Sequence, residues 1–159
     1  MRVAAGHANS RLLRHMPAVL AAAILLALVP LVSKLMPIEV YSTRTAEVRD
    51  LVLPDGSRVI LSASSRIELG FKGRARFVRL SSGEAYFEVA QDPARLFVVD
   101  AGAATVRVLG TRFSVRRGIQ QVSVAVLKGR VEVLSSTQPG QVLTAGQQVT
   151  IDVGLPVPK

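Results

Sequence analysis

Hydrophobic and polar residues alternate one by one along most of the chain after residue 46. In the stretch 84–89, Ala85, Phe87 and Val89 share one side, and the other side is mostly polar. Strict alternation predicts β-strands that bury one face and expose the other, and abundant valine adds to the preference for strands. Because each strand keeps a polar face, antiparallel pairing is favoured over a parallel sheet covered by helices. The same alternation returns in the stretches 121–126, 129–134 and 147–153.

Turn residues separate the predicted strands. Pro54, Asp55 and Gly56 lie between the apolar runs 51–53 and 59–61. Proline presets φ, aspartate bonds to the backbone and glycine tolerates a positive φ, so this segment predicts a hairpin turn. Further turns are expected at four later glycines, which are Gly83, Gly110, Gly129 and Gly146.

These signals predict an all-β domain over residues 46–153, antiparallel and built from ten or more short strands. No segment after Met36 has the i, i+3, i+4 spacing of a long amphipathic helix. Both a sandwich and a rolled sheet remain open. The core is expected to contain all five phenylalanines, which are Phe71, Phe77, Phe87, Phe97 and Phe113.

An apolar segment precedes this domain. Residues 16–33 carry no charge, and as a helix they would span about 27 Å, near the ~30 Å thickness of the hydrocarbon core of a membrane. A transmembrane helix is therefore predicted, with a cleaved signal peptide or a buried soluble helix as alternatives. The predicted divisions are a basic tail (1–15), the transmembrane helix (16–37), a linker (38–45), the β domain (46–153) and a tail (154–159).

The charges around the apolar segment predict its orientation. Arg11 and Arg14 stand in a tail without acidic residues, whereas Glu39 and Glu47 accompany the basic residues that follow the segment. Basic residues favour the cytoplasmic side, and long folded domains cross the membrane largely regardless of their charge. We therefore expect a cytoplasmic N-terminus and an extracytoplasmic β domain.

The composition excludes most catalytic chemistry. Cysteine is absent, and the only histidines, His7 and His15, precede the apolar segment. The domain thus lacks a thiolate nucleophile, a His or Cys metal ligand and a Ser-His-Asp triad, so we expect no enzyme activity, cofactor or metal. The net charge is +9, of which residues 39–159 carry +5, and the chain has no Trp and only two Tyr. This pattern does not indicate a nucleic-acid-binding surface.

Six short motifs occur in order along the domain. They are LPDGS at 53–57, GEAYFEVA at 83–90, DPAR at 92–95, VLGTRFSV at 108–115, VLKGRV at 126–131 and LTAGQ at 143–147. In this order, behind one apolar segment, they resemble the extracytoplasmic domain of the FecR family of iron-dicitrate sensors and anti-sigma proteins. The resemblance covers roughly residues 46–150.

The resemblance implies a regulator of the bacterial inner membrane with its β domain in the periplasm. Such proteins receive a signal from a TonB-dependent outer-membrane receptor loaded with a ferric siderophore, and they control an extracytoplasmic-function sigma factor in the cytoplasm. The alternative is a structural or scaffolding protein of the envelope that reuses the same domain.

Family members carry a larger cytoplasmic region that holds the sigma factor, and a further C-terminal domain implicated in receptor contact. Here 15 residues precede the apolar segment and the chain ends at Lys159. We therefore expect that this chain alone binds no sigma factor with useful affinity. It would instead sense, or modulate a full-length relative through its β domain.

Two stretches are candidate surfaces for a partner. The first is Leu109, Gly110, Thr111, Arg112 and Phe113, either a displayed recognition turn or a turn that Phe113 anchors in the core. The second is the basic stretch of Arg74, Arg76 and Arg79, either a patch for an anionic partner or a solvated hairpin whose charges protect a sheet edge.

Overall fold

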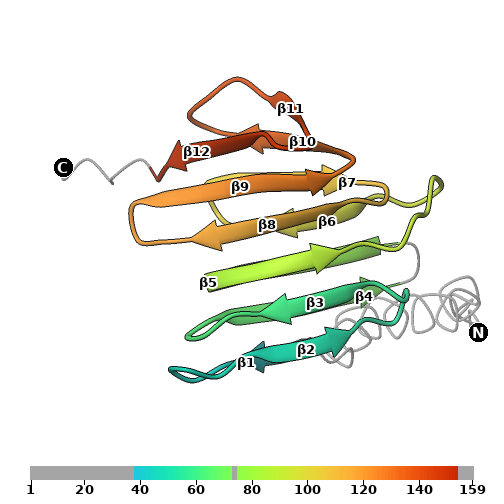
Figure 1. Cartoon of the computed structure of the whole chain (residues 1–159), viewed down its shortest axis with the longest axis vertical. Helices are drawn as coiled ribbons and strands as arrows, with labels where there is room; N and C mark the ends of the chain where they lie inside the picture. The colour runs from blue at the N-terminus through green and yellow to red at the C-terminus, as the bar shows by residue number, and fades with distance from the viewer. Residues whose placement is uncertain (1–37, 73–74, 154–159) are drawn as a thin grey trace, which may run out of the picture. The chain divides into compact units, whose positions relative to one another are not determined.

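The computed structural model describes residues 38–72 and 75–153, which form the β domain in Figure 1. The prediction of an all-β domain with ten or more strands is confirmed. The expected basic tail and transmembrane helix, and the expected tail at 154–159, lie outside the described residues. Within those residues no helix is long and apolar enough to cross a membrane.

The twelve strands are β1 (Glu39–Ser42), β2 (Arg49–Val52), β3 (Arg58–Leu61), β4 (Arg66–Lys72), β5 (Ala75–Glu88), β6 (Phe97–Asp100), β7 (Ala104–Val108), β8 (Arg112–Arg117), β9 (Gln121–Lys128), β10 (Arg130–Ser135), β11 (Gln141–Thr144) and β12 (Gln148–Asp152).

The strands form two layers that share one strand, β5. The first layer has the order β1-β4-β5-β6-β7-β10-β11, and the second has the order β2-β3-β5-β8-β9-β12. Figure 1 shows β2, β3, β8, β9 and β12 in front, with β1, β4, β6 and β7 behind them. The domain is therefore a sandwich made by folding one continuous sheet over itself.

The two layers share β5 because this strand bends in its middle. Its first half pairs with β4 and β6, and its second half, from Gly83 to Glu88, pairs with β8. Gly83 has a φ of +81°, which residues with a Cβ rarely adopt. Ser65, between β3 and β4, packs so closely that a Cβ on Gly83 would lie 2.1 Å from its Oγ. Gly83 thus lies inside a strand, at a corner, and not in the hairpin turn expected there.

One strand pair departs from the expected antiparallel arrangement. β6 runs parallel to the first half of β5, from Arg76 opposite Phe97 to Arg79 opposite Asp100. Because β5 ends in the second layer, residues 89–96 must carry the chain back to the first layer before β6 begins. Alternation along a single strand does not reveal such a crossover, since the return path depends on the bend in β5.

Residues 38–45 are not a linker, which corrects the expected domain boundary. β1 pairs with β4, and Tyr41 packs against the core. The hydroxyl of Thr43 donates a hydrogen bond to the carbonyl oxygen of Ser62 at 2.6 Å. β1 has only four residues, and Tyr41 is its only apolar residue on the core side, so it was too short for an alternating pattern to identify.

The core between the layers has an aromatic centre. Phe87 stacks on Phe113 with ring centroids 5.1 Å apart. Phe97, from the first layer, meets Phe87 edge-on at 6.1 Å, which is a favourable geometry for aromatic pairs. All three rings are fully buried, and Phe71 packs partly buried against the same cluster.

Phe77 corrects the expectation that every phenylalanine is in the core. In the first half of β5 the inward positions belong to Arg76, Val78 and Leu80. Phe77 therefore lies on the outer face, opposite Gly70 of β4, and the guanidinium of Arg79 lies 5.9 Å from its ring centroid.

Replacing Gly83 with alanine should destabilise the domain strongly, because the new Cβ would combine a disfavoured φ with a clash against Ser65. We expect Gly83→Ala to lower the free energy of unfolding by about 3 kcal/mol, measured by urea denaturation of the full chain. Gly146→Ala is the matched control, since its φ is +83° and nothing lies within 4 Å of the added Cβ. It should cost only about 1 kcal/mol. Equal losses for the two variants would contradict the packing role of the corner.

Candidate functional site

Five connections that are distant in the sequence meet at one end of the sandwich. The hydroxyl of Ser57, in the β2–β3 turn, accepts a hydrogen bond from the backbone of Ala90, and the backbone of residues 89–92 bonds to that of residues 109–111. A Cβ on Gly129 would lie 2.7 Å from Thr111. Backbone hydrogen bonds join Gly146 and Gln147 to Val126, near the end of β9. We call this the Arg76 end, which is formed by residues 53–57, 89–96, 109–111, 129 and 145–147. Each of the six motifs noted in the sequence contributes residues to it.

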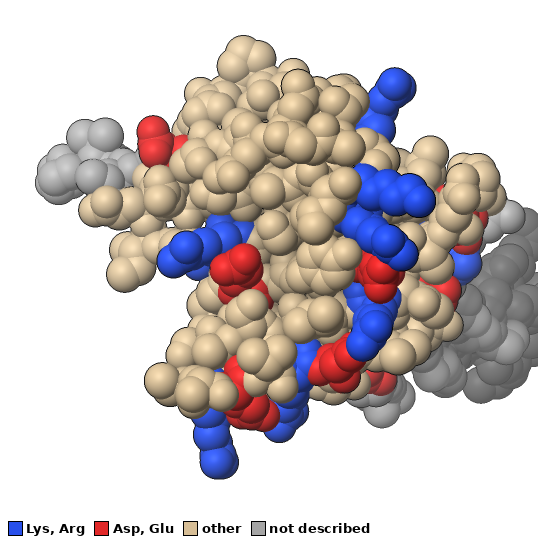
Figure 2. Space-filling view, viewed as in Figure 1, with Lys and Arg blue, Asp and Glu red and all other residues tan. Residues whose placement is uncertain are grey.

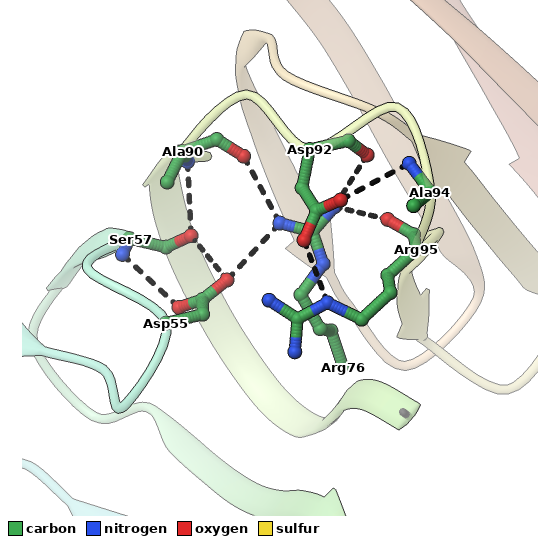
Figure 3. Close-up of polar contacts among 7 residues, drawn as sticks. All are labelled: Asp55, Ser57, Arg76, Ala90, Asp92, Ala94 and Arg95. Atoms are coloured by element: carbon green, nitrogen blue, oxygen red, sulfur yellow. Dashed lines mark hydrogen bonds and ion pairs between the residues drawn. The ribbon is translucent and has the colours of Figure 1, made fainter. Parts of the chain in front are cut away.

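Arg76 is the buried centre of this end, with only 1% of its side chain exposed. Its guanidinium donates to Asp55 at 3.2 Å and to the carbonyl oxygens of Ala90, at 3.0 Å, and Arg95 (Figure 3). It also lies 5.6 Å from the centroid of the Phe97 ring. A buried charge is tolerated only when it is paired and hydrogen-bonded, and these contacts provide both. Arg76 thereby holds the β5–β6 connection against the β2–β3 turn.

Asp55 joins the β2–β3 turn to Arg76 through a second set of hydrogen bonds. The backbone N–H of Ser57 donates to Oδ1 of Asp55 at 3.0 Å, and the hydroxyl of Ser57 donates to Oδ2 at 2.7 Å. The same hydroxyl accepts from the N–H of Ala90 at 3.0 Å. Figure 3 shows that these residues form one connected network. The turn predicted at Pro54, Asp55 and Gly56 is therefore also part of the buried network.

The β5–β6 connection is stabilised locally as well. Arg95 donates to the carboxylate of Asp92 at 2.6 Å, and the N–H of Ala94 donates to the same carboxylate at 3.0 Å. The hydrogen bond from Arg95 is the main reason that the pKa of Asp92 lies below its ordinary value. The motif DPAR is thus a hydrogen-bonded turn.

The structure separates the residues of the predicted basic patch. Arg76 is buried and therefore cannot belong to a surface patch. Arg79 points outward and pairs with Asp100 at 3.1 Å and with Glu68 at 3.9 Å. Arg74 lies outside the described residues. Side chains alternate between the two faces of a strand, so Arg76 points inward like Val78 and Leu80. The prediction that Arg76 belongs to an exposed basic patch was therefore wrong.

The segment from Leu109 to Phe113 alternates between surface and interior. Leu109 and Arg112 are exposed, whereas Thr111 and Phe113 are buried. Gly110 lies so close to Gln91 that a Cβ would be 2.7 Å from its Cα. The exposed part of this segment is a turn held from behind by residues 89–92.

Two surface pockets flank this turn, and both are lined by Gly110 and Thr111. The first has a volume of about 330 Å³ and is mainly apolar, with Leu96, Leu109 and Val142 in its lining. The second has a volume of about 640 Å³ and a mixed lining, with charged residues from β3, β5, β8 and β9. We name them the apolar pocket and the charged groove.

Charged residues line up across the second layer along the charged groove. Arg58 pairs with Asp50 and stands opposite Glu88. Glu88 pairs with Arg112 at 2.6 Å, and Arg112 stands opposite Lys128. The hydrogen bonds from Arg58 hold the pKa of Asp50 below its ordinary value. Figure 2 shows blue and red side chains alternating along one rim of this face.

Two pockets and an exposed turn are the main surface features of this end. Within residues 38–72 and 75–153, no group of three His, Asp or Glu side chains is placed to hold a metal ion. Sequence reasoning identified the turn at 109–112 but missed Leu96, Val142 and Lys128. Solvent exposure of Leu96 and Val142 is a property of the assembled surface, for which the sequence gives no signal.

Removing the buried guanidinium should destabilise the domain more than removing an exposed one. Arg76→Met leaves Asp55 buried without its cation, and we expect a loss of about 3 kcal/mol or more in the free energy of unfolding. Arg79→Met is the control, because half of the Arg79 side chain is exposed, and it should cost less than ~1 kcal/mol. Chemical denaturation followed by circular dichroism measures both. A stable Arg76→Met variant would contradict the central role of this network.

Comparison with known proteins agrees with this architecture. Two crystal structures, at 2.50 and 1.65 Å resolution, of a "putative anti-sigma factor from Parabacteroides distasonis ATCC 8503" are similar to this chain, with a TM-score of 0.68 and 29% sequence identity. The similarity covers 74% of this chain and 56% of that protein, so the chain spans little more than half of its length. No curated protein sequence matches this chain. Residues 39–132 match the family described as FecR protein, and the chain belongs to the FecR family.

Proposed function

We propose that the protein is a signal-transducing regulator of the FecR type. In this proposal it relays a signal from a TonB-dependent outer-membrane receptor toward an extracytoplasmic-function sigma factor. The observation that carries the proposal is the family match over residues 39–132, which falls on a compact domain with surface pockets at one end. The Parabacteroides protein, by its description as an anti-sigma factor, supports the same pathway.

The proposed mechanism is transmission by binding. The sandwich is a rigid support, because the Arg76 network ties its connections together, and the turn at 109–112 is displayed on that support. Binding sites are often placed on loops that a rigid scaffold positions. A partner that binds at this end would need no chemical step to pass on its signal.

The apolar segment at 16–33 supports a proposed location in the inner membrane, with the β domain in the periplasm. A reporter enzyme that is active only outside the cytoplasm should be active when fused after Lys159 and silent when fused at the N-terminus. Immunoblots confirm that both fusions are made. A silent C-terminal fusion that is present at normal levels would reverse the proposed orientation.

Deleting the gene should alter a coherent set of transcripts if the protein regulates a sigma factor. We expect the affected genes to share one promoter motif and to change several-fold together, measured by transcript profiling. The full chain and Arg79→Met should restore the wild-type pattern, whereas Arg76→Met should not, because its domain is destabilised.

Two results would contradict the regulatory proposal. One is the absence of any coordinated transcript set in the deletion strain. The other is a loss of envelope integrity without a transcript response, which would favour the scaffolding alternative.

A further inference from the structure

Exposed hydrophobic side chains gather at the Arg76 end. Among the described residues nine large hydrophobic side chains are exposed, and five of them lie at or beside this end. Single exposed hydrophobic residues are ordinary, whereas a group of them marks an interaction surface. The five are Val52, Leu96, Leu109, Leu127 and Val142.

Three of these residues, from connections far apart in the sequence, line the apolar pocket. Leu96 follows the DPAR turn, Leu109 begins the turn at 109–112, and Val142 lies on β11. They are 49%, 44% and 56% exposed, respectively. The pocket, at about 330 Å³, is large enough to receive a bulky side chain. Because the pocket lies beside the exposed turn at 109–112, a partner that binds the turn can also insert a side chain into the pocket.

Cations surround the same turn. The linings of the two pockets together contain five cations against two carboxylates, Glu88 and Glu132. The five cations are Arg58, Arg107, Arg112, Lys128 and Arg130.

Lys128 and Arg130, on either side of Gly129, form no ion pair within the described residues. The strand pairing makes Lys128 more unusual, because it stands opposite Arg112. Like charges directly opposite each other destabilise a sheet. The register shifts between Arg112 and Phe113, and at this irregularity both Leu127 and Lys128 are exposed in succession. An apolar side chain and a cation are thereby presented together next to the charged groove. Because Arg112 is already paired with Glu88, Lys128 is the cation there that an added anion would neutralise.

A second copy of this chain is a poor source of that anion. Eight of its 11 acidic residues already form ion pairs. The other three, Glu39, Glu84 and Asp152, lie on different strands and form no cluster. The complementary charge is therefore better supplied by a different molecule.

We propose that the Arg76 end binds a segment of a partner protein that carries a bulky apolar side chain close to acidic residues. The apolar side chain enters the pocket at Leu96, Leu109 and Val142, and the carboxylates meet Lys128 and Arg130. This inference deepens the proposed function, on which it rests, by stating the chemistry of the partner. Burial of the apolar anchor provides affinity, and the charges provide specificity and dependence on salt.

A random peptide library displayed on phage tests this inference with the purified full chain as target. We expect enriched peptides to combine a bulky apolar residue with Asp or Glu a few positions away. A labelled peptide from the enriched set should bind in fluorescence anisotropy, and its affinity should fall as salt is added. Replacing its acidic residues by their amides should weaken binding at least tenfold.

Paired variants assign the binding to the proposed residues. Leu109→Ser with Val142→Ser, and separately Lys128→Ser with Arg130→Ser, should each weaken the peptide at least tenfold. Ile119→Ser is the matched control, because Ile119 is 97% exposed in the β8–β9 turn, and it should leave the affinity unchanged. All four positions of the test variants are exposed, so circular dichroism should show unaltered folding.

Several outcomes would overturn the inference. They are the absence of any enriched peptide, enrichment without acidic residues, and equal affinity in the paired variants and the wild type. Self-association, or binding to vesicles containing phosphatidylglycerol, that is lost in these variants while no peptide binds would assign the surface to a second copy or to a membrane.

The two proposals fail separately. If the wild-type chain binds no peptide but the deletion strain still shows the coordinated transcript response, this inference alone is refuted. Peptide binding without a transcript response refutes the regulatory function instead.

Discussion

Arg76 places a positive charge inside the sandwich, and the β2–β3 turn and the β5–β6 connection meet around it. Its guanidinium binds the Asp55 carboxylate in the β2–β3 turn and backbone carbonyl oxygens in the β5–β6 connection. Desolvation of a charge is costly unless it is paired and hydrogen-bonded, and both terminal nitrogens of the Arg76 guanidinium have partners, whereas its Nε has none. The connection at 89–96 can therefore satisfy Arg76 only along a restricted path. The same connection returns the chain to the first layer, where β6 pairs parallel to β5.

The surface at this end depends on the buried network beneath it. Residues 89–92, which follow β5 and lie over Arg76, hold the backbone of residues 109–111 by hydrogen bonds. Gly110 and Gly129 permit the close approaches that bring the turn, Thr111 and the β9–β10 connection together. Leu109 and Arg112 consequently project from a well-supported turn, with one pocket on each side. Residues from each of the six motifs therefore stabilise this end of the sandwich, and a few residues of these motifs, such as Leu109 and Arg112, are exposed on its surface.

The proposed binding role agrees with membership of the FecR family. The domain concentrates aromatic packing in its centre and exposed apolar and cationic groups at one end. This separation lets the core maintain the fold while the end remains available to a partner. The chain spans 56% of the Parabacteroides protein, so the common part is the platform, and the proposed relay depends on what binds to it.

Local patterns determined most of the strands, several turns and the all-β class, because alternation and turn chemistry act between residues that are close in the sequence. The turn at Pro54, Asp55 and Gly56 was predictable for this reason. Tertiary structure alone decided which layer each strand joins, that Gly83 bends a strand, and that Phe77 faces outward. It also decided that Arg76 is buried, although arginine is ordinarily exposed, because its partners Asp55, Ala90 and Arg95 come from two other segments of the chain. The same holds for the apolar pocket, since Leu96, Leu109 and Val142 become neighbours only when the folded sheet brings their connections to one end.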